Sequence, residues 1–169
     1  MLKKALFLDR DGVVNVEKHY VYRPQDFEFM GGIFELCLDY QRTGHEVVVI
    51  TNQAGIARGL YSEDDFCRLT EWMSARFLDH GVRLAGVYHC PHHPDFTGPC
   101  KCRKPAPGMI LSARDGLGLD LAASTLLGDK QSDLEAGARA GVGHLGLVRG
   151  HRHIESVEFQ EPRTAPTIH

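Results

Sequence analysis

The sequence predicts an α/β fold, a doubly wound (Rossmann-like) parallel sheet of about five strands flanked by helices. Two observations carry this prediction. Short apolar runs alternate along the chain with segments of helical periodicity, which is typical of βαβ units. The apolar runs are also nearly continuous in Val, Ile and Leu, as expected of strands that helices cover on both faces.

Five strands and four helices can be placed in order. The strands are expected at residues 5–9, 46–51, 84–90, 125–129 and 144–148. The helices are expected at residues 32–43, 62–80, 108–117 and 132–140. Ser62 followed by Asp65 approximates a capping box, which marks a helix start. Gly44, Gly81 and Gly141 mark helix ends.

The length of the chain bounds the number of domains. A chain of 169 residues is long enough for one domain with a sizeable core and too short for two comfortable ones. We therefore assign residues 1–149 to a single domain. Residues 150–169 are polar, contain proline and lack a pattern, so we expect them to be a C-terminal tail.

The charge and hydropathy of the chain exclude several kinds of partner. A formal net charge of −3 lacks the basic footprint of a nucleic-acid-binding domain. No apolar run approaches the length of a membrane span, and Asp9 and Asp11 interrupt any secretory signal near the N-terminus. We expect a cytoplasmic, monomeric protein that binds neither nucleic acid nor membrane.

Polar residues follow the predicted strands at their carboxyl ends, where ligands of parallel sheets bind. They are Asp9 and Asp11 after the first strand, Thr51, Asn52 and Gln53 at the second, Arg103 and Lys104 after the third and its loop, and Asp129 and Lys130 at the fourth. Aspartate at such a corner can also be an ordinary turn former. A matched set of carboxylates, a hydroxyl and cations at one edge favours a functional site over a series of turns.

These groups suit a magnesium-assisted reaction on a phosphate. Magnesium prefers a few carboxylates together with water and substrate oxygens, and a carboxylate can itself accept a phosphoryl group. Phosphoryl transfer depends mainly on positioning and charge neutralisation. A metal, a lysine and a hydroxyl are therefore suitable parts.

Three of the five cysteines cluster with histidines in the segment YHCPHHPDFTGPCKCRKP. An odd number of cysteines without a secretory signal is poor material for a disulfide framework. A complete tetrahedral set for a structural zinc ion is present instead: Cys90, His92, Cys100 and Cys102. Such an ion would hold the loop that leads to Arg103 and Lys104. His93 is an alternative to His92 as ligand, and the cysteines could also be ordinary surface thiols.

Four segments together resemble the motifs of the haloacid dehalogenase (HAD) superfamily of aspartate-nucleophile phosphatases: DRDGVVN, ITNQAGIARG, CKCRKPAPGM and GDKQSDLEAGARAGV. The first motif is moderately specific alone, whereas all four in this order and spacing are strong. The likeness covers residues 5 to about 148. More narrowly, TNQAGIARG, YHCPHHP and CRKPAPGM are similar to the D-glycero-D-manno-heptose-1,7-bisphosphate 7-phosphatase family.

The resemblance implies roles for individual residues. Asp9 would be the nucleophile, and Asp11 would be the general acid and base. Magnesium would be held by the carboxylates of Asp9 and Asp129 and the backbone carbonyl of Asp11, while Thr51 and Lys104 would bind the phosphoryl oxygens. The substrate contacts that the resemblance implies are Glu17, Lys18, His19, Tyr20, Asn52, Gln53, Arg103 and Lys130.

The resemblance also bears on the surroundings of the site. About twenty residues separate Asp11 from the next predicted helix, which leaves no room for the separate cap domain that many relatives carry. An open site rimmed by loops is therefore expected, and its specificity must come from those loops. Asp133 is either a supporting partner of the catalytic residues or a plain acid at a helix N-terminus.

The expected activity follows from the resemblance. It implies a magnesium-dependent phosphomonoesterase with structural zinc that removes the 7-phosphate of heptose 1,7-bisphosphate through an aspartyl-phosphate intermediate, in the synthesis of nucleotide-activated heptose for lipopolysaccharide core or a related glycan. The partner would be a small-molecule sugar bisphosphate. Two alternatives stay open: a histidinol-phosphate phosphatase, whose family also has compact zinc loops, and a non-catalytic, zinc-stabilised binding module.

Overall fold

Six strands form one sheet at the centre of the protein, in a computed structural model that describes residues 1–161. The order across the sheet is β3-β2-β1-β4-β5-β6, in which the first five strands are parallel and β6 is antiparallel to β5. The bounds are β1 (Lys4–Leu8), β2 (His45–Asn52), β3 (Leu84–Cys90), β4 (Thr125–Gly128), β5 (His144–Arg149) and β6 (Ser156–Phe159). The predicted doubly wound parallel sheet is confirmed.

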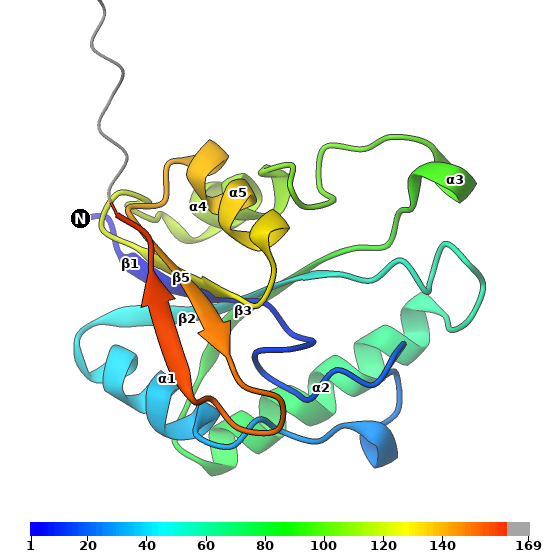
Figure 1. Ribbon diagram of the computed structural model, residues 1–169, viewed down its shortest axis with the longest axis horizontal. Coiled ribbons are helices and arrows are strands. Elements are labelled where there is room, and N and C mark those ends of the chain that lie inside the picture. Colours follow the sequence, from blue (N-terminus) through cyan, green and yellow to red (C-terminus); the bar gives the residue numbers. More distant parts are fainter. Residues whose placement is uncertain (162–169) are drawn as a thin grey trace, which may run out of the picture.

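Helices cover both faces of the sheet (Figure 1). Below it in this view lie α1 (Ile33–Arg42) and α2 (Glu63–Asp79), and above it lie α4 (Gly108–Leu117) and α5 (Gln131–Ala140). Two shorter elements, the 3-10 helix η1 (Pro24–Asp26) and α3 (Pro94–Thr97), lie in the loops. Within residues 1–161 there is no separate cap domain, as expected.

The central strand shows why the apolar runs lack alternation. Successive side chains of a strand point to opposite faces of the sheet. In β1, Leu6 and Leu8 belong to the core cluster with α1 and α2, whereas Ala5 and Phe7 belong to the cluster with α4 and α5. Because both faces are covered, every one of these positions is apolar and fully buried.

The bounds of the predicted strands and helices agree with the structure to within one residue at every end. The capping box at the start of α2 is confirmed, because the Asp65 amide donates to the Ser62 hydroxyl over 3.0 Å and the Ser62 amide donates to the Asp65 carboxylate over 2.9 Å. This helix starts where the local sequence predicts because its first turn satisfies its own free N–H groups.

The segment predicted to be a tail contributes the sixth strand. β6 pairs antiparallel with β5, so that Val157 lies opposite Val148, and the Val157 side chain packs against the core cluster with α1 and α2. The tail prediction is therefore wrong for residues 156–159. An edge strand with one covered side chain carries too short an apolar signal to be recognised. Residues 162–169 of the predicted tail lie outside the described residues.

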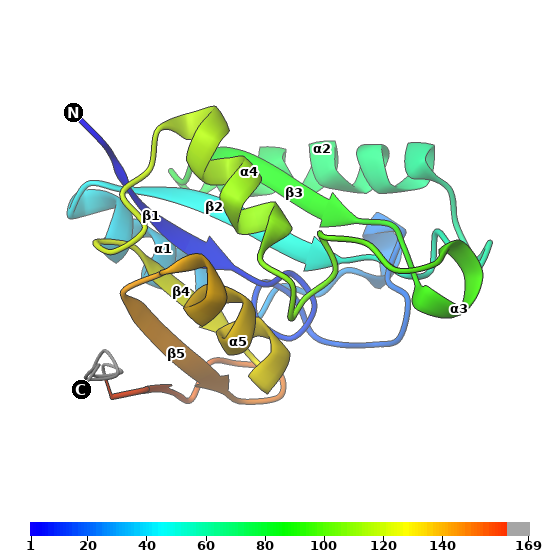
Figure 2. The ribbon, with the colours of Figure 1, turned by 90° about the horizontal axis from the view of Figure 1, so that it is seen from above.

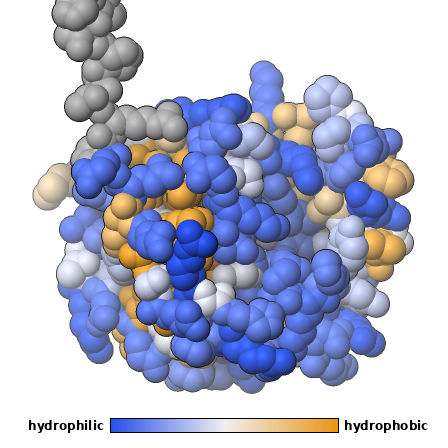
Figure 3. All heavy atoms as spheres, viewed as in Figure 1, coloured by the Kyte–Doolittle hydropathy of each residue, from blue (hydrophilic) through white to orange (hydrophobic). Residues whose placement is uncertain are grey.

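The surface of the face seen in Figure 1 is mainly hydrophilic, with smaller apolar areas between the polar ones (Figure 3). Among the helices of residues 1–161, none is long and apolar enough to cross a membrane.

Replacing Phe77 by alanine should show how much α2 contributes to the core. Phe77 is fully buried, and its ring contacts Phe29 and Phe34 with centroids 5.7 and 5.3 Å apart. We expect Phe77→Ala to lower the free energy of unfolding by about 3–5 kcal/mol, because the substitution removes a buried ring with its aromatic contacts and leaves a cavity in the core. Urea denaturation measures this change. Leu78→Ala, at a side chain that is largely exposed, is the control and should change stability by less than about 0.5 kcal/mol. Equal losses of stability for both variants would contradict the placement of Phe77 in the core.

Candidate active site

A cavity of about 470 Å³ opens at the carboxyl ends of β1, β2 and β4, beside the point between β1 and β4 where the strand order reverses. In Figure 2 the arrowheads of β1, β2 and β3 point to the same end of the molecule, and α3 lies there. The residues that line the cavity are Asp9, Asp11, Glu17, His19, Tyr20, Asn52, Gln53, Ala54, Gly55, Tyr61, Arg103, Lys104, Lys130, Ser132 and Asp133.

Lys104 lies between two carboxylates in the floor of this cavity. Its Nζ is 2.8 Å from Oδ1 of Asp9 and 2.6 Å from Oδ1 of Asp133, and all three side chains are buried. Burial opposes the charged form of Lys104, but Asp9 and Asp133 outweigh it and raise the pKa of the ammonium group. A fixed positive charge therefore lies beside Asp9, where it can neutralise a transferring phosphoryl group.

Asp9 itself is a buried carboxylate next to other carboxylates. Burial raises its pKa well above the ordinary value, Asp133 and Asp129 push in the same direction, and Lys104 opposes them. The Asp133 carboxylate is held in place by two hydrogen bonds, which its Oδ2 accepts from the backbone N–H groups of Asp129 and Lys130 over 3.2 and 3.1 Å. Asp133 is thus a supporting partner of Lys104 and also the acid in the first turn of α5.

Asp129 faces Asp9 across the loop after β1. Gly12 has φ +97°, and a Cβ there would lie 2.1 Å from Oδ2 of Asp129, so only glycine lets the loop pass this close. Oxygens of Asp9, Asp129 and Asp133 lie within 4.8 Å of one another. Oδ1 of Asp129 is buried without a hydrogen-bond partner, and burial raises the pKa of this carboxyl. A divalent cation would supply the missing partner, and these oxygen ligands fit magnesium.

Asp11 is held by three side-chain donors. Arg10 contacts both of its oxygens over 3.2 Å, Asn15 donates to Oδ1 over 2.9 Å, and Gln53 donates to Oδ2 over 3.1 Å. The carboxylate of Asp11 lines the same cavity as that of Asp9. A carboxyl group that is held in this way and lines the same cavity as Asp9 can exchange a proton with a leaving oxygen or a water molecule.

Thr51 and Asn52 at the end of β2, and Gln53 directly after it, make different contacts. Asn52 clamps the neighbouring loop, because its Oδ1 accepts the Lys104 amide over 3.0 Å. The Thr51 hydroxyl is buried and accepts a hydrogen bond from Gln53 over 2.8 Å. Thr51 and Asp129 do not line the cavity themselves, whereas Asn52 and Gln53 do.

The rim of the cavity contains most of the predicted substrate contacts. Glu17, His19 and Tyr20 line it from the loop after β1, and Lys130 lines it from the start of α5. His19 and Tyr20 both have positive φ, at 57° and 55°, a backbone conformation that is rare outside glycine and is concentrated at functional sites. Lys18 is exposed and is not among the lining residues.

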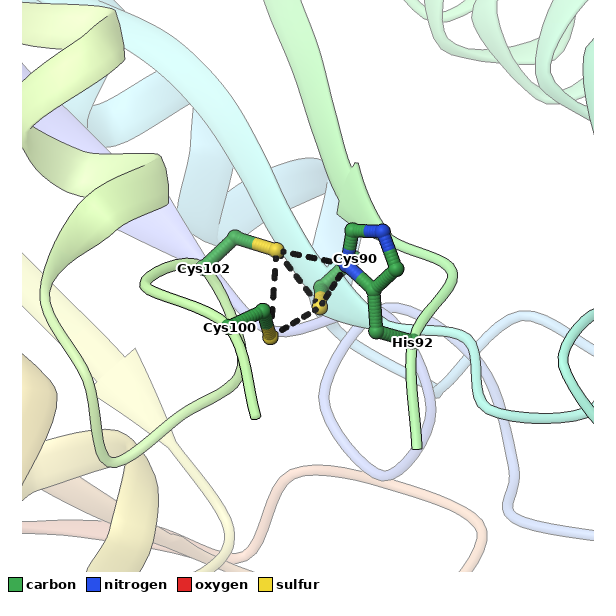
Figure 4. Close-up of side chains that lie close together, drawn as sticks. All are labelled: Cys90, His92, Cys100 and Cys102. Atoms are coloured by element: carbon green, nitrogen blue, oxygen red, sulfur yellow. Dashed lines mark hydrogen bonds between the residues drawn. The ribbon is translucent and has the colours of Figure 1, made fainter. Parts of the chain in front are cut away.

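The cysteine–histidine group lies at the end of β3, where its four side chains point toward one another (Figure 4). Sγ of Cys100 is 3.6 Å from those of Cys90 and Cys102, the latter two lie 2.7 Å apart, and Nδ1 of His92 is 3.6 and 3.2 Å from Cys90 and Cys102. Tetrahedral ligands at zinc–sulfur distances would lie about 3.8 Å apart, so the group is slightly tighter than a filled site. These four residues could hold a metal ion.

The three thiols of this group differ in their acidity. Burial raises the pKa of the Cys90 and Cys102 thiols, whereas at Cys100 the backbone N–H groups of Arg103 and Cys102 outweigh burial and lower the pKa to about 6. His93 is not part of the group. Its Nδ1 accepts the Asp95 amide over 3.1 Å, and its Nε2 lies 3.3 Å from Arg58. Of the two histidines, His92 is therefore the one that the fold places with the cysteines.

Sequence reasoning missed Arg10, Asn15 and Tyr61 in this site. Arg10 is almost fully buried, contacts Asp11, and donates to the Val21 carbonyl over 2.7 Å. The sequence does offer a signal for Arg10, which lies between Asp9 and Asp11 directly after an apolar strand. A charged side chain in such a place is usually paired with its acidic neighbours. Tyr61 gives no such signal, because its partner Gln53 is set by the folding of a loop.

Comparisons with known proteins show which family this chain is similar to. A family model of HAD-hydrolase-like proteins matches residues 101–168. A D-glycero-beta-D-manno-heptose-1,7-bisphosphate 7-phosphatase from Vibrio cholerae is 51% identical over 159 residues, which are 91% of this chain and 86% of that protein. The solved structure of a D,D-heptose 1,7-bisphosphate phosphatase from B. bronchiseptica, complexed with magnesium and phosphate, is 34% identical with a TM-score of 0.75, and the match covers 82% of this chain and 76% of that one.

The second solved structure, of a HAD-like phosphatase candidate from Mesorhizobium loti, is 37% identical with a TM-score of 0.80 over 88% of this chain and 74% of that one. Identity of this level over nearly the whole chain, together with the cavity at the carboxyl edge of the sheet, fixes the family. This chain belongs to the D-glycero-D-manno-heptose-1,7-bisphosphate 7-phosphatase family of HAD-like phosphatases.

Proposed function

We propose that this chain is a magnesium-dependent phosphomonoesterase that hydrolyses the 7-phosphate of D-glycero-D-manno-heptose 1,7-bisphosphate and releases heptose 1-phosphate. The reaction would serve the synthesis of nucleotide-activated heptose. The observation that carries the chemistry is the placement of Asp9 and Asp11 in one cavity, with Lys104 bound to Asp9 over 2.8 Å. The substrate is inferred from the activity of heptose-1,7-bisphosphate 7-phosphatases that are about half identical to this chain.

In the first step, a carboxylate oxygen of Asp9 forms a bond to phosphorus, and the bond from phosphorus to the sugar oxygen breaks. Asp11 gives its proton to the departing alkoxide. In the second step, Asp11 removes a proton from water, the water oxygen bonds to phosphorus, and the bond from phosphorus to Asp9 breaks. Inorganic phosphate leaves, and both carboxyl groups return to their starting states.

Fixed charges reduce the cost of both steps. Lys104 keeps its positive charge beside Asp9 because Asp133 holds it from the other side. The phosphoryl group would therefore meet a positive charge that does not need to reorganise. Asn52 fixes the backbone of Lys104, so the end of β2 also helps to set the position of this charge.

Two metal sites belong to the proposal. Magnesium would be held by the carboxylates of Asp9 and Asp129 and by the backbone carbonyl of Asp11, and when bound it would neutralise phosphate charge. Zinc would be held by the cysteine–histidine group and would fix the loop that carries Arg103 and Lys104. A cytoplasmic location and a monomeric state stay predictions from the sequence.

A direct comparison of substrates tests the proposed function. Phosphate release should be measured with heptose 1,7-bisphosphate, histidinol phosphate and p-nitrophenyl phosphate, in the presence of magnesium. We expect the highest kcat/KM for the heptose bisphosphate. A higher kcat/KM for histidinol phosphate would mean that the protein is a histidinol-phosphate phosphatase. If none of the three compounds is hydrolysed, the alternative of a non-catalytic binding module is favoured.

Arg103→Ala should separate sugar recognition from chemistry. Arg103 lines the cavity. Within the described residues, its guanidinium donates a long hydrogen bond of 3.4 Å to the carbonyl of His92, so the group is available to a ligand. Its fork can pair two oxygens of the second phosphate or of the sugar. We expect kcat/KM to fall by about tenfold or more for heptose bisphosphate and to change little for p-nitrophenyl phosphate.

The matched control for this prediction is Lys101→Ala, an exposed cation on the same loop that does not line the cavity. It should leave both kcat/KM values close to those of the unmodified protein. Equal losses on both substrates for Arg103→Ala, or no loss, would mean that other residues form the rim contacts.

A further inference from the structure

The side-chain amide of Gln53 connects three groups of the site. Its Nε2 donates to Oδ2 of Asp11 over 3.1 Å and to the hydroxyl of Thr51 over 2.8 Å, and its Oε1 accepts the hydroxyl of Tyr61. Gln53 and Tyr61 are both buried, with 3% and 7% of their surfaces exposed. Both N–H bonds and the oxygen of the amide are therefore engaged inside the protein.

The Tyr61 hydroxyl decides which way this amide points. A side-chain amide can turn by 180° and exchange its oxygen with its nitrogen, and turning Gln53 would place Oε1 against the carboxylate of Asp11. Burial raises the pKa of Tyr61 to about 12, so its hydroxyl keeps its proton and remains a donor. A donor behind Oε1 favours the orientation that presents both N–H bonds to Asp11 and Thr51.

Packing holds the Tyr61 ring in place. It is stacked on Tyr22 with centroids 5.3 Å apart and planes at 9°. It also lies against Gly55, where a Cβ would be 2.2 Å from Cε1 of Tyr61. Because residue 55 is glycine, no side chain at this position pushes the ring away from Gln53.

We propose that Tyr61 is a positioning residue that acts through Gln53 to hold the carboxylate of Asp11 in its reactive orientation. This inference rests on the proposed function, in which Asp11 is the general acid and base. Tyr61 also lines the cavity, but its hydroxyl is bonded to Gln53, and Gln53 links it to Asp11.

The dependence on the leaving group distinguishes this role from a general loss of structure. The value of kcat/KM reports on the steps up to departure of the leaving group. A sugar alkoxide needs the proton of Asp11 to depart, whereas p-nitrophenolate is stable enough to leave without it. A misplaced Asp11 should therefore lower kcat/KM for the sugar bisphosphate and affect the aryl phosphate much less.

Tyr61→Phe removes the hydroxyl and keeps the ring, and it is the main test. We expect kcat/KM for heptose bisphosphate to fall about ten- to hundredfold, the cost of one lost buried hydrogen bond, with a change of less than about threefold for p-nitrophenyl phosphate. Tyr22→Phe is the control, because it keeps the stacked ring and does not touch Gln53. It should leave both values unchanged.

Two further variants keep the inference falsifiable. Gly55→Ala, which displaces the Tyr61 ring, should give the same selective loss. In a protein that already carries Gln53→Leu, adding Tyr61→Phe should cause no further loss, since the two residues act as one unit. Equal losses on both substrates, a full additional loss in the double variant, or no effect of Tyr61→Phe would overturn the inference.

Asp11→Asn in the same assays separates this inference from the proposed function. If Asp11→Asn keeps most of the activity on heptose bisphosphate, the acid–base assignment fails whatever Tyr61 does. If Asp11→Asn loses that activity and Tyr61→Phe does not, only the role of Tyr61 fails.

Discussion

Replacing Asp9 by asparagine is expected to reduce phosphate release by at least about four orders of magnitude, because an amide cannot form the covalent bond to phosphorus and is a poor ligand for magnesium. The fold should survive. Asparagine keeps an oxygen that can accept from Lys104, and Asp133 still pairs with Lys104 from the other side. Since burial raises the pKa of Asp9, removing its charge should not lower stability.

The measurements for this variant are phosphate release under saturating substrate and the midpoint of thermal unfolding. Asp115→Asn makes the same chemical change at an exposed residue of α4 that pairs with Arg114, and it should leave activity unchanged. If Asp9→Asn kept even a tenth of the activity, Asp9 would not be the nucleophile.

Disrupting the cysteine–histidine group should have the second large effect. Cys102→Ser removes one of four converging ligands, and the chain continues directly from this residue to Arg103 and Lys104. We expect the bound zinc to fall from about one ion per chain to far less, and the free energy of unfolding to fall by more than about 4 kcal/mol, because metal binding contributes directly to folding. Elemental analysis and urea denaturation measure the two quantities.

Cys67→Ser is the matched control, since Cys67 is exposed on α2 and remote in sequence from the other cysteines. It should change neither the metal content nor the stability. A strong chelator should reproduce the effect of Cys102→Ser, whereas removal of magnesium alone should stop turnover reversibly and leave the fold intact. Protein that is purified without zinc and has normal stability would contradict the proposed metal site.

The sequence by itself determined the five parallel strands and the four long helices. These elements have local signals. Continuous apolar runs mark strands that are covered on both faces, and Ser62 with Asp65 marks a helix start within one turn. It also determined where a site could lie, because the carboxyl ends of parallel strands meet at one edge. The same rule brought Asp9 and Lys104 to one cavity, although 95 residues separate them.

The sixth strand needed the tertiary structure. Val157 is partly covered only because it lies against the core next to β5, and a single covered residue leaves no periodicity in the sequence. The same holds for the choice between His92 and His93. Both histidines have a spacing that suits a metal ligand, and only the folding of the loop turns His92 toward the cysteines and His93 toward Arg58.

The partners of Asp11 were also decided by tertiary structure. Arg10 and Asn15 are near it in sequence, but Gln53 is 42 residues away, and Tyr61 reaches it only through Gln53. Hydrogen bonds of this kind depend on the directions of side chains at the ends of different elements, which no single segment encodes. The sequence could therefore name the reacting groups, because their chemistry is local to a residue type, whereas the orientation of those groups comes from contacts that exist only in the folded chain.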